Sequence, residues 1–437
     1  MQNIKKKALI WLRNDLRIDD HFAFSHAAQN CDQLVAYYTF DPDHYKKNRW
    51  GFIKTGSFRT QFLVETIQQL KKDLAKKNIS LIIESQVPEI GIPKWLEILG
   101  ITDLYFQNEW TSEEFKSSES LQKKISNHIR IHNYYDQFLF HPEDIPVEVE
   151  SLPEVFTVFR KQCEKSSKVR PCFTEISPFP KENILDQDFK LPMLSSQEFN
   201  KIEHHPNSAF PFKGGSQEGK DRINQYFWQT KKLSYYKQTR NGLIGVDYSS
   251  KLSAWLANGS LSSRQIYWEV MNYEKEVKKN QSTYWMIFEL IWRDYFKYIS
   301  LKHRNKIFHL DGILNNKYNW DTDRNKFDSW INGTTSEAFV NANMIEILKT
   351  GWMSNRGRQN VASFFAKDLF MDWRMGAAYF ESMLVDYDVH SNYGNWMYVS
   401  GVGNDPRDRK FNIRIQSERY DQGGKFQRMW NQKSLFE

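Results

Sequence analysis

The first 140 residues alternate short apolar runs with stretches of helical periodicity. The runs that predict buried strands are 8–13, 34–40, 79–85 and 103–110. Apolar positions three and four apart predict a long helix over 57–77, and a polar helix is expected from about Ser112. Strands that alternate with helices indicate a doubly wound, mostly parallel sheet, so we expect an α/β domain over 1–140.

The rest of the chain changes character twice. Residues 141–210 are rich in proline, serine and charge, with one short helical pattern at 153–165, and are interpreted as a connecting segment. Residues 211–437 are interpreted as an all-helical domain. Its predicted helices are 218–232, 250–257, 262–278, 282–300, 324–332, 336–350, 357–371 and 374–384.

The turn after the first strand is charged and carries no glycine. It reads Asn14-Asp15-Leu16-Arg17, whereas parallel sheets that bind dinucleotides often have G-x-G-x-x-G at this place. Any nucleotide cofactor must therefore bind elsewhere in the chain.

Composition narrows the class of protein. The 437 residues are 40% hydrophobic and 26% charged, as in globular proteins, and include 15 Trp, 21 Tyr and 31 Phe. No apolar run is long enough for a membrane span, and the first residues lack the apolar core of a signal peptide. Cys31, Cys163 and Cys172 have spacings that fit neither a disulfide framework nor a metal site. We therefore expect a monomeric cytoplasmic protein without a membrane partner or a metal. The net charge of +7 permits a nucleic-acid partner without requiring one.

The stretch 371–406 is rich in polar acceptors and aromatic residues. A helical pattern gives way there to a turn-rich segment that carries Asp386, Asp388, His390 and Asn392. An Asn-Tyr-Gly-Asn-Trp turn is then expected to lead into a second, aromatic-rich segment. Acceptors at alternate positions over an aromatic floor could hold a ligand that is both planar and polar.

Two simpler interpretations compete with such a ligand site. Alternating oxygen ligands are typical of calcium loops, but counting from Asp386 places Ser391 where those loops need glycine. Met397 stands where the bidentate Glu should be, so the calcium interpretation fails. A capped helix end followed by core tryptophans stays open from this stretch alone.

The predicted helix 282–300 has charged residues within an aromatic stripe. Trp285, Glu289, Trp292, Arg293 and Phe296 share one broad face at spacings of three and four. A Glu289–Arg293 pair within the helix would explain the two charges structurally. Alternatively, Arg293 binds a ligand phosphate and Glu289 hydrogen-bonds a substrate.

Two short segments are candidate anion sites. Residues 248–253, Tyr-Ser-Ser-Lys-Leu-Ser, place hydroxyls and a lysine before a helix start, which suits a pyrophosphate. Residues 355–360 place two arginines around a glycine, which can bind phosphates. Either segment could also be an ordinary helix cap.

Together these segments resemble the photolyase/cryptochrome flavoproteins, in particular their cryptochrome DASH branch. The resemblance rests on ALIWLRNDLR, ELIWRDYF, GWMSNRGRQNVASFFAKDLFMDWR and DYDVHSNYGNWMYVSGVGNDPR, in this order and spacing, and covers nearly the whole chain. It implies an N-terminal α/β antenna domain and a C-terminal all-helical domain that holds FAD.

The resemblance also implies which residues serve the cofactor. Those expected near its phosphate and ribose are Tyr236, Ser249, Ser250, Lys251, Leu252, Ser253 and Arg293. Those expected around the flavin are Asn355, Arg358, Asp386, Asp388 and Asn392, with Arg358 paired to Asp386, and Trp285 and Glu289 are also expected at the cofactor. Trp396, Trp373 and Trp320 match the family's electron-hopping tryptophans. A second chromophore, 5,10-methenyltetrahydrofolate, is expected as an antenna near Glu109 and Glu113.

The implied activity is light-driven repair of cyclobutane pyrimidine dimers that are flipped out of DNA. Glu289 and Trp292 would contact the dimer, and Arg240, Arg356 and Gln416 match DNA-contacting positions. Gln359 and Tyr398 replace the Met and Trp that are common in duplex-repairing members. This pocket should grip a flipped base less strongly, so single-stranded or looped DNA is the expected partner.

Some positions depart from the family pattern and put the geometry of the substrate rim in question. They are Thr335, Ser336, Glu337, Ala338, Asn341 and the altered order at Asp19, Asp20 and His21. A blue-light sensor or nucleic-acid-binding regulator is the alternative function, although the match ends close to residue 437 and no long signalling tail is expected. A third possibility is a flavin oxidoreductase that uses a nicotinamide, but the sequence has no nicotinamide motif to support it.

Overall fold

The computed structural model describes residues 5–192 and 202–432. The N-terminal part is a five-stranded, all-parallel sheet in the order β3-β2-β1-β4-β5. Its strands are β1 (Lys7–Trp11), β2 (Gln33–Thr39), β3 (Leu81–Glu84), β4 (Asp103–Gln107) and β5 (Arg130–Tyr134). The predicted doubly wound α/β domain is confirmed.

The sheet contains one strand that the hydrophobic pattern did not reveal. β5 pairs with β4 at the edge of the sheet, and of its five residues only Tyr134 is buried. Because the other side chains are at least partly exposed, the strand has no apolar run. The four predicted strands are buried almost throughout, which is why their apolar runs were visible in the sequence.

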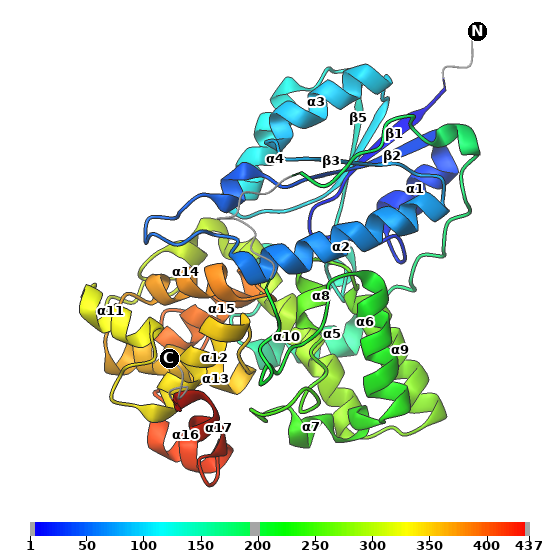
Figure 1. The fold of residues 1–437 in the computed structure, drawn as a ribbon. Helices are drawn as coiled ribbons and strands as arrows, with labels where there is room; N and C mark the ends of the chain where they lie inside the picture. Colours follow the sequence, from blue (N-terminus) through cyan, green and yellow to red (C-terminus); the bar gives the residue numbers. More distant parts are fainter. Residues whose placement is uncertain (1–4, 193–201, 433–437) are drawn as a thin grey trace.

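Helices pack on both faces of this sheet (Figure 1). They are α1 (Phe22–Asn30), α2 (Ser57–Lys76), α3 (Pro88–Leu99) and α4 (Ser112–Lys124). The predicted helix 57–77 corresponds to α2, and the polar helix from Ser112 to α4. α1 and α3 were not predicted.

Of the connecting segment, the described residues 141–192 and 202–210 are largely irregular. They contain α5 (Phe156–Ser166), close to the predicted helical pattern. This helix packs on α10 (Gln281–His303) of the helical domain, and residues around 179–183 lie on the N-terminal domain. The Asn183 side chain exchanges hydrogen bonds with the backbone of Leu34 at 2.9 Å in each direction, and the Phe179 N–H donates to the Lys77 carbonyl at 2.9 Å. These bonds attach this part of the segment to β2 and to the end of α2.

The C-terminal part is built almost entirely from helices around one large aromatic core. The helices are α6 (Ser216–Ile223), α7 (Tyr236–Thr239), α8 (Ser253–Ala257), α9 (Ser263–Glu276), α10 (Gln281–His303), α11 (Arg324–Ile331), α12 (Ala338–Thr350), α13 (Asn355–Ser363), α14 (Trp373–Met383), α15 (Val389–Ser400), α16 (Ile413–Tyr420) and α17 (Lys425–Asn431). Each predicted helix of this region is present within a few residues. Short π-helical turns extend α6 and α13.

The expected Asn-Tyr-Gly-Asn-Trp turn is wrong. These residues lie inside α15, which begins where the Asp388 side chain accepts the Ser391 N–H at 2.8 Å. A β-carbon at Gly394 would lie 2.3 Å from the Phe296 ring, so glycine is needed for α15 to pack closely on α10. The residues that suggested a turn therefore serve a helix cap and a close helix–helix contact.

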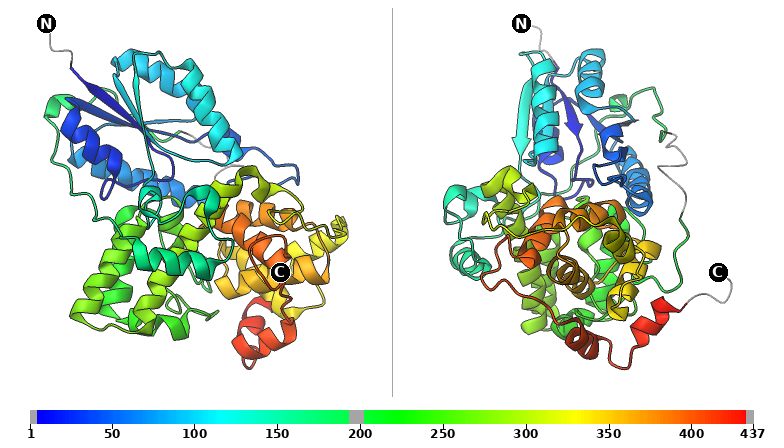
Figure 2. Two further views of the ribbon diagram at one scale, coloured as in Figure 1. Left: turned by 180° about the vertical axis from the view of Figure 1, so that it is seen from behind. Right: turned by 90° about the vertical axis from the view of Figure 1, so that its left-hand side faces the viewer.

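The two domains meet along α2, which lies at the boundary in the views of Figures 1 and 2. A second contact between the domains is centred on Arg264 of α9. Its guanidinium binds Asp20 at 2.8 and 3.0 Å and Asp136 at 3.0 Å. Arg17 donates to the Gly259 carbonyl of the helical domain at 3.0 Å. All four side chains are buried, so these charges depend on one another for solvation.

Substitution of Asp20 by Asn should destabilise the protein. Burial raises the pKa of Asp20, but Arg264 and Arg17 lower it below its usual value overall. Its stabilising contribution is therefore present above the unfolded pKa of about 4 and is lost as the pH falls through the folded value. We expect D20N to lose about 3–5 kcal/mol in urea unfolding at pH 7, because Arg264 keeps a buried charge without its main partner.

The matched control is Asp19→Asn. Asp19 pairs with Lys220 at the surface, where an ion pair is worth about 1 kcal/mol or less. Equal stability of D20N and D19N at pH 7 would contradict the role given to the buried network.

Candidate functional site

The helical domain encloses a cavity of about 520 Å³ and, next to it, a smaller one of about 70 Å³. They share wall residues from α13 and α15 and from the turn that precedes α15. The predicted residues that line the larger cavity are Tyr236, Arg240, Ser249, Ser250, Lys251, Leu252, Ser253, Glu289, Trp292, Arg293, Asn355, Arg356, Arg358, Gln359, Asp386, Asp388 and Tyr398. Asn392 and Trp396 line the smaller one.

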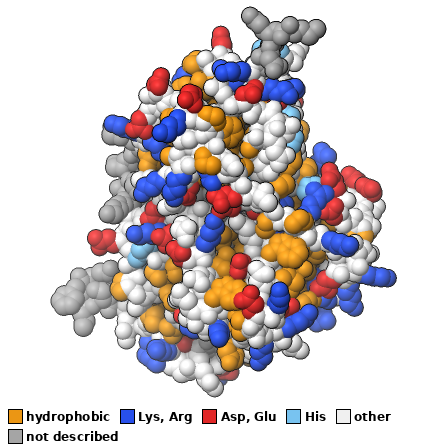
Figure 3. Space-filling view, turned by 90° about the vertical axis from the view of Figure 1, so that its right-hand side faces the viewer, with side chains coloured by type: hydrophobic (Ala, Val, Ile, Leu, Met, Phe, Trp, Pro, Cys, Tyr) orange, Lys and Arg blue, Asp and Glu red, His pale blue; other side chains and the backbone are white. Residues whose placement is uncertain are grey.

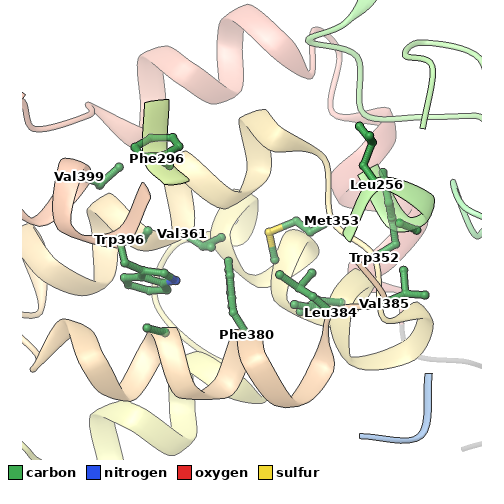
Figure 4. Packing of buried hydrophobic residues seen from close by; sticks show 14 of the residues in the cluster. Leu256, Phe296, Trp352, Met353, Val361, Phe380, Leu384, Val385, Trp396 and Val399 are labelled. Carbon is green, nitrogen blue, oxygen red and sulfur yellow. The ribbon is translucent and has the colours of Figure 1, made fainter. Parts of the chain in front are cut away.

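An apolar wall that the sequence did not single out completes the cavities. Figure 4 shows Leu256 and Trp352 on one side and Phe380 between them and Trp396, the one of these four that was predicted. Apolar surface with a few converging polar groups is typical of cofactor pockets. These residues are hard to identify in a sequence with so many aromatics, because core and cavity wall have the same composition.

The segment 248–253 presents a cation to the cavity. Arg222 fixes its backbone by donating to the carbonyls of Ser249 and Ser250 at 3.0 and 2.9 Å. Lys251 has a φ of 64°, and its ammonium lies 3.2 Å from the centre of the Tyr248 ring. Among the described residues this buried ammonium has no hydrogen-bond partner, and burial lowers the pKa of Lys251 well below its usual value.

Asp386 ties three parts of the wall together. The Arg358 guanidinium donates to both carboxylate oxygens of Asp386 at 2.9 and 3.0 Å, so the expected pair is present. Ser253 Oγ donates to the same carboxylate at 2.7 Å, and Arg358 Nε also donates to the Met353 carbonyl at 2.9 Å. These bonds hold three parts of the wall together: the start of α8, helix α13 and the turn before α15.

Asp388 has a cationic partner that the sequence did not point to. Lys297, one turn beyond Arg293 on α10, donates to Asp388 Oδ2 at 3.0 Å. Burial raises the pKa of Asp388, but Lys297, His390 and Arg293 together bring it far below its usual value. The carboxylate is therefore ionised at neutral pH. In the sequence, the i,i+4 spacing of Lys297 from Arg293 is the feature that could have identified Lys297 as a site residue.

Glu289 is not paired with Arg293. Arg240 Nη1 donates to Glu289 Oε1 at 2.6 Å, whereas Arg293 donates to the backbone carbonyls of Gln137 and Leu256 at 2.6 and 2.9 Å. The intrahelical ion pair considered above is therefore absent. Burial raises the pKa of Glu289, although Arg240 opposes that rise.

Trp396 and Trp373 are both buried, at 2% and 0% exposure, while Trp320 is partly exposed. A β-carbon at Gly376, one turn after Trp373 on α14, would lie 2.2 Å from the Trp396 ring, so the two helices touch there. Trp320 precedes Asp321, which bridges to Met371 just before α14. The three rings thus belong to neighbouring elements that run from the smaller cavity to the surface.

Besides Trp373 and Trp320, four predicted site residues lie outside the two cavities. Trp285 packs on Phe288 with ring centres 4.5 Å apart, and Gln416 lies on α16. Glu109 follows β4, and Glu113 pairs with Lys54 at 2.5 Å. Met286, not Trp285, lines the cavity on that turn of α10.

The positions that depart from the family pattern do not line either cavity. Asn341 Oδ1 accepts hydrogen bonds from the Thr335 N–H and hydroxyl at 2.9 and 2.7 Å, which closes a loop before α12. Asp20 belongs to the interface between the domains. These departures from the family pattern therefore lie away from the walls of the two cavities.

Known families account for both halves of the chain. The family model described as "DNA photolyase" matches residues 8–181, and the model described as "FAD binding domain of DNA photolyase" matches residues 285–433. The chain is 43% identical over 434 residues to the cryptochrome DASH of Synechocystis sp., covering 98% of this chain and 88% of that protein. The chain belongs to the photolyase/cryptochrome family, in its cryptochrome DASH branch.

A vertebrate relative and a solved structure agree. The cryptochrome DASH of Danio rerio is 44% identical over 425 residues, covering 96% of this chain and 82% of the relative. The crystal structure of the Synechocystis sp. PCC6803 cryptochrome superposes with a TM-score of 0.94 at 42% identity, covering 98% of this chain and 89% of that one.

The helical domain is thus the FAD-binding domain of this family, and its cavities fit the cofactor. FAD carries a pyrophosphate, and Lys251 offers a buried cation without a partner beside the hydroxyls of segment 248–253. The apolar wall suits the rings. In residues 5–192 and 202–432, no cluster of His, Cys, Asp or Glu could hold a metal. Within the same ranges, no helix is long and apolar enough to cross a membrane.

Replacement of Lys251 by Met should separate cofactor binding from protein stability. We expect FAD affinity to fall by roughly 10–100-fold, because hydrogen bonds to charged groups contribute about 1.5–3 kcal/mol. The apoprotein should keep or gain thermal stability, because an unpaired buried ammonium is unfavourable. FAD titration and thermal unfolding measure the two effects.

Lys237→Met is the control, because Lys237 lies outside the cavity wall and bonds Gln281 at 2.8 Å. A K251M protein that binds FAD as tightly as K237M would show that Lys251 does not contact the pyrophosphate.

Proposed function

We propose that the protein uses blue light to split cyclobutane pyrimidine dimers in single-stranded or looped DNA. One observation carries the proposal: Glu289 and Trp292, one turn apart on α10, line the same cavity as the residues expected to bind FAD. A polar acid and a flat aromatic ring next to the cofactor provide what a flipped-out dimer needs, namely hydrogen bonding and stacking. A light sensor without repair would have no such use for Glu289.

Bound FAD in its reduced form supplies light-driven electron donation to the dimer. The residues of the chain hold the partners in place. Arg358 and Lys297 fix Asp386 and Asp388. Glu289 would hydrogen-bond the dimer, and burial raises the pKa of its carboxyl. Arg240 keeps Glu289 oriented and adds a positive charge near the opening. Arg356 lines the same cavity and would bind a flanking phosphate.

Asn392 serves the flavin in this proposal. Its Nδ2 donates to the Ala377 carbonyl at 3.0 Å, which orients the amide and leaves Oδ1 free to accept from the cofactor. An amide does not supply a proton as a carboxylic acid would. Trp396, Trp373 and Trp320 would deliver electrons that keep the cofactor reduced.

The proposed antenna is 5,10-methenyltetrahydrofolate, bound where α4 of the N-terminal domain approaches α14. Beside Glu109 and Glu113, burial and the charge of Glu109 raise the pKa of Glu114 to about 7. Burial likewise raises the pKa of Glu381 on α14 to about 7. Several carboxyl groups with raised pKa can accept from the ring N–H and amino groups of a pterin or donate to its nitrogens.

The proposed partner is a single strand because the cavity offers Tyr398 and Gln359 to the flipped base. The Tyr398 ring lies edge-on to Trp292, with centres 6.0 Å apart. On the face in Figure 3 basic and acidic side chains are interspersed, so the +7 charge does not form one strong phosphate-binding patch there. We further propose a cytoplasmic monomer, in keeping with three cysteines that are free.

Glu289→Gln should weaken repair without loss of FAD. The variant keeps the shape of the side chain but changes the charge and proton that it can offer the dimer, and it removes the ion pair with Arg240. We expect the repair yield per absorbed photon to fall by a factor of roughly 2–10, the equivalent of one hydrogen bond of about 0.5–1.5 kcal/mol. Repair of a dimer-containing oligonucleotide at a known photon dose measures this. Full yield in E289Q would leave Glu289 a structural partner of Arg240.

Trp373→Phe should abolish rapid reduction of bound oxidised FAD under blue light with an external thiol. Repair by chemically pre-reduced protein should persist, because electron donation to the dimer does not use this route. Trp255→Phe is the control, because Trp255 is another fully buried tryptophan that packs on Phe62 and Phe210. Absorbance at the flavin band follows the reduction. Unchanged rates in W373F would assign electron supply to other aromatics.

The unmodified protein should repair dimers in single strands well and in intact duplex poorly at moderate salt. Flipping from a duplex costs a few kcal/mol, and stacking on an aromatic ring contributes roughly 1–3 kcal/mol per base. Gln359→Met combined with Tyr398→Trp should therefore raise duplex repair at least partly. Equal repair of both substrates by the unmodified protein would contradict the proposed preference.

A further inference from the structure

The connecting segment contributes one residue that packs against Trp292, a residue of the cavity wall. Phe156, the first residue of α5, stacks on Trp292 with ring centres 3.6 Å apart and planes 12° from parallel. Phe156 is only 6% exposed and also makes edge contacts with Phe288 and Tyr295 of α10. One face of the Trp292 indole is therefore covered by a ring from outside the helical domain's own sequence.

The start of α5 is firmly attached to the helix that carries Trp292. The Glu154 carbonyl accepts from the hydroxyl of Tyr295 and from Asn404 Nδ2, and its carboxylate accepts from Lys302 at 2.6 Å and His303 at 3.0 Å. Burial raises the pKa of Glu154, but the hydrogen bonds from His303 and Lys302 lower it to about 2, so the Glu154 carboxylate is ionised at neutral pH. Three of these partners lie on α10, so Phe156 and Trp292 are held on one rigid unit.

We propose that Phe156 is a positioning residue that fixes the plane of Trp292 for stacking on the flipped dimer; this inference rests on the proposed function. An indole side chain can change rotamer, and each change would move its face away from the base. Contact with Phe156 on one face restricts that freedom, while the indole still lines the cavity where the base would bind. Pre-orientation of this kind favours a damaged, flipped base and contributes nothing to phosphate contacts along the strand.

The test compares two matched variants of α5, Phe156→Leu and Phe159→Leu. Phe159 is also buried, at 0% exposure, and touches Tyr295 and Tyr298 but not Trp292. Both changes remove a ring from the same helix and should lower the melting temperature similarly. The measurement is the ratio of Kd for an undamaged single-stranded oligonucleotide to Kd for the same oligonucleotide with one thymine dimer.

We expect F156L to lower this ratio by roughly 2–10-fold, the range expected for one aromatic stacking contact. Binding of the undamaged strand and FAD content should not change, and repair per photon at saturating substrate should stay within about twofold. F159L should keep the ratio of the unmodified protein. This pattern separates positioning of Trp292 from general packing of α5.

Two results would overturn the inference. An equal loss in F156L and F159L would assign the effect to α5 as a whole, and an unchanged ratio in F156L would show that Trp292 holds its plane without the stack. Failure of the proposed function looks different. In that case the unmodified protein itself binds damaged and undamaged strands equally, and the inference falls with it.

Discussion

Buried charge needs a partner, and this requirement organises the helical domain. A cavity of about 520 Å³ lies within an aromatic core, and its wall carries Asp386, Asp388 and Glu289. Each of these carboxyl groups meets a cation from a different element: Arg358 of α13, Lys297 of α10 and Arg240 after α7. Removal of one partner would leave an ion that the core cannot solvate. The pairs therefore fix the relative positions of the helices and keep the wall polar where a cofactor binds.

Lys251 differs from these charge pairs and marks where an anionic ligand would bind in the cavity. Its ammonium lies against aromatic rings without a hydrogen bond among the described residues, although Glu346 nearby is a buried carboxyl whose pKa burial raises to about 8. An arrangement of this kind is unfavourable on its own and becomes favourable when an anion arrives. The family's FAD provides such an anion, so the least satisfied part of the wall is where the ligand contributes most.

The sequence predicts regular elements well where burial is one-sided or complete, and poorly where a neighbour decides the structure. Apolar runs revealed β1 to β4, whereas β5 stayed hidden because its side chains face solvent at the sheet edge. Gly394 suggested a turn, and only the approach of Phe296 shows why it belongs in a helix. At the site, motifs gave the residues of segment 248–253, α13 and α15. Lys297 and Phe156 were missed because their importance lies in contacts between elements far apart in the chain.

The arrangement of charge and aromatic rings also separates affinity from selectivity. Phosphate contacts raise affinity for any strand and weaken with salt, whereas discrimination comes from groups that meet the base. In this protein the basic side chains on the face of Figure 3 alternate with acidic ones, and Arg240 is already engaged by Glu289. Under the proposed function, selectivity would come mainly from the cavity, where Trp292 is backed by Phe156 and lies near-perpendicular to the Tyr398 ring. A base that is already unpaired would enter it without the cost of leaving a duplex.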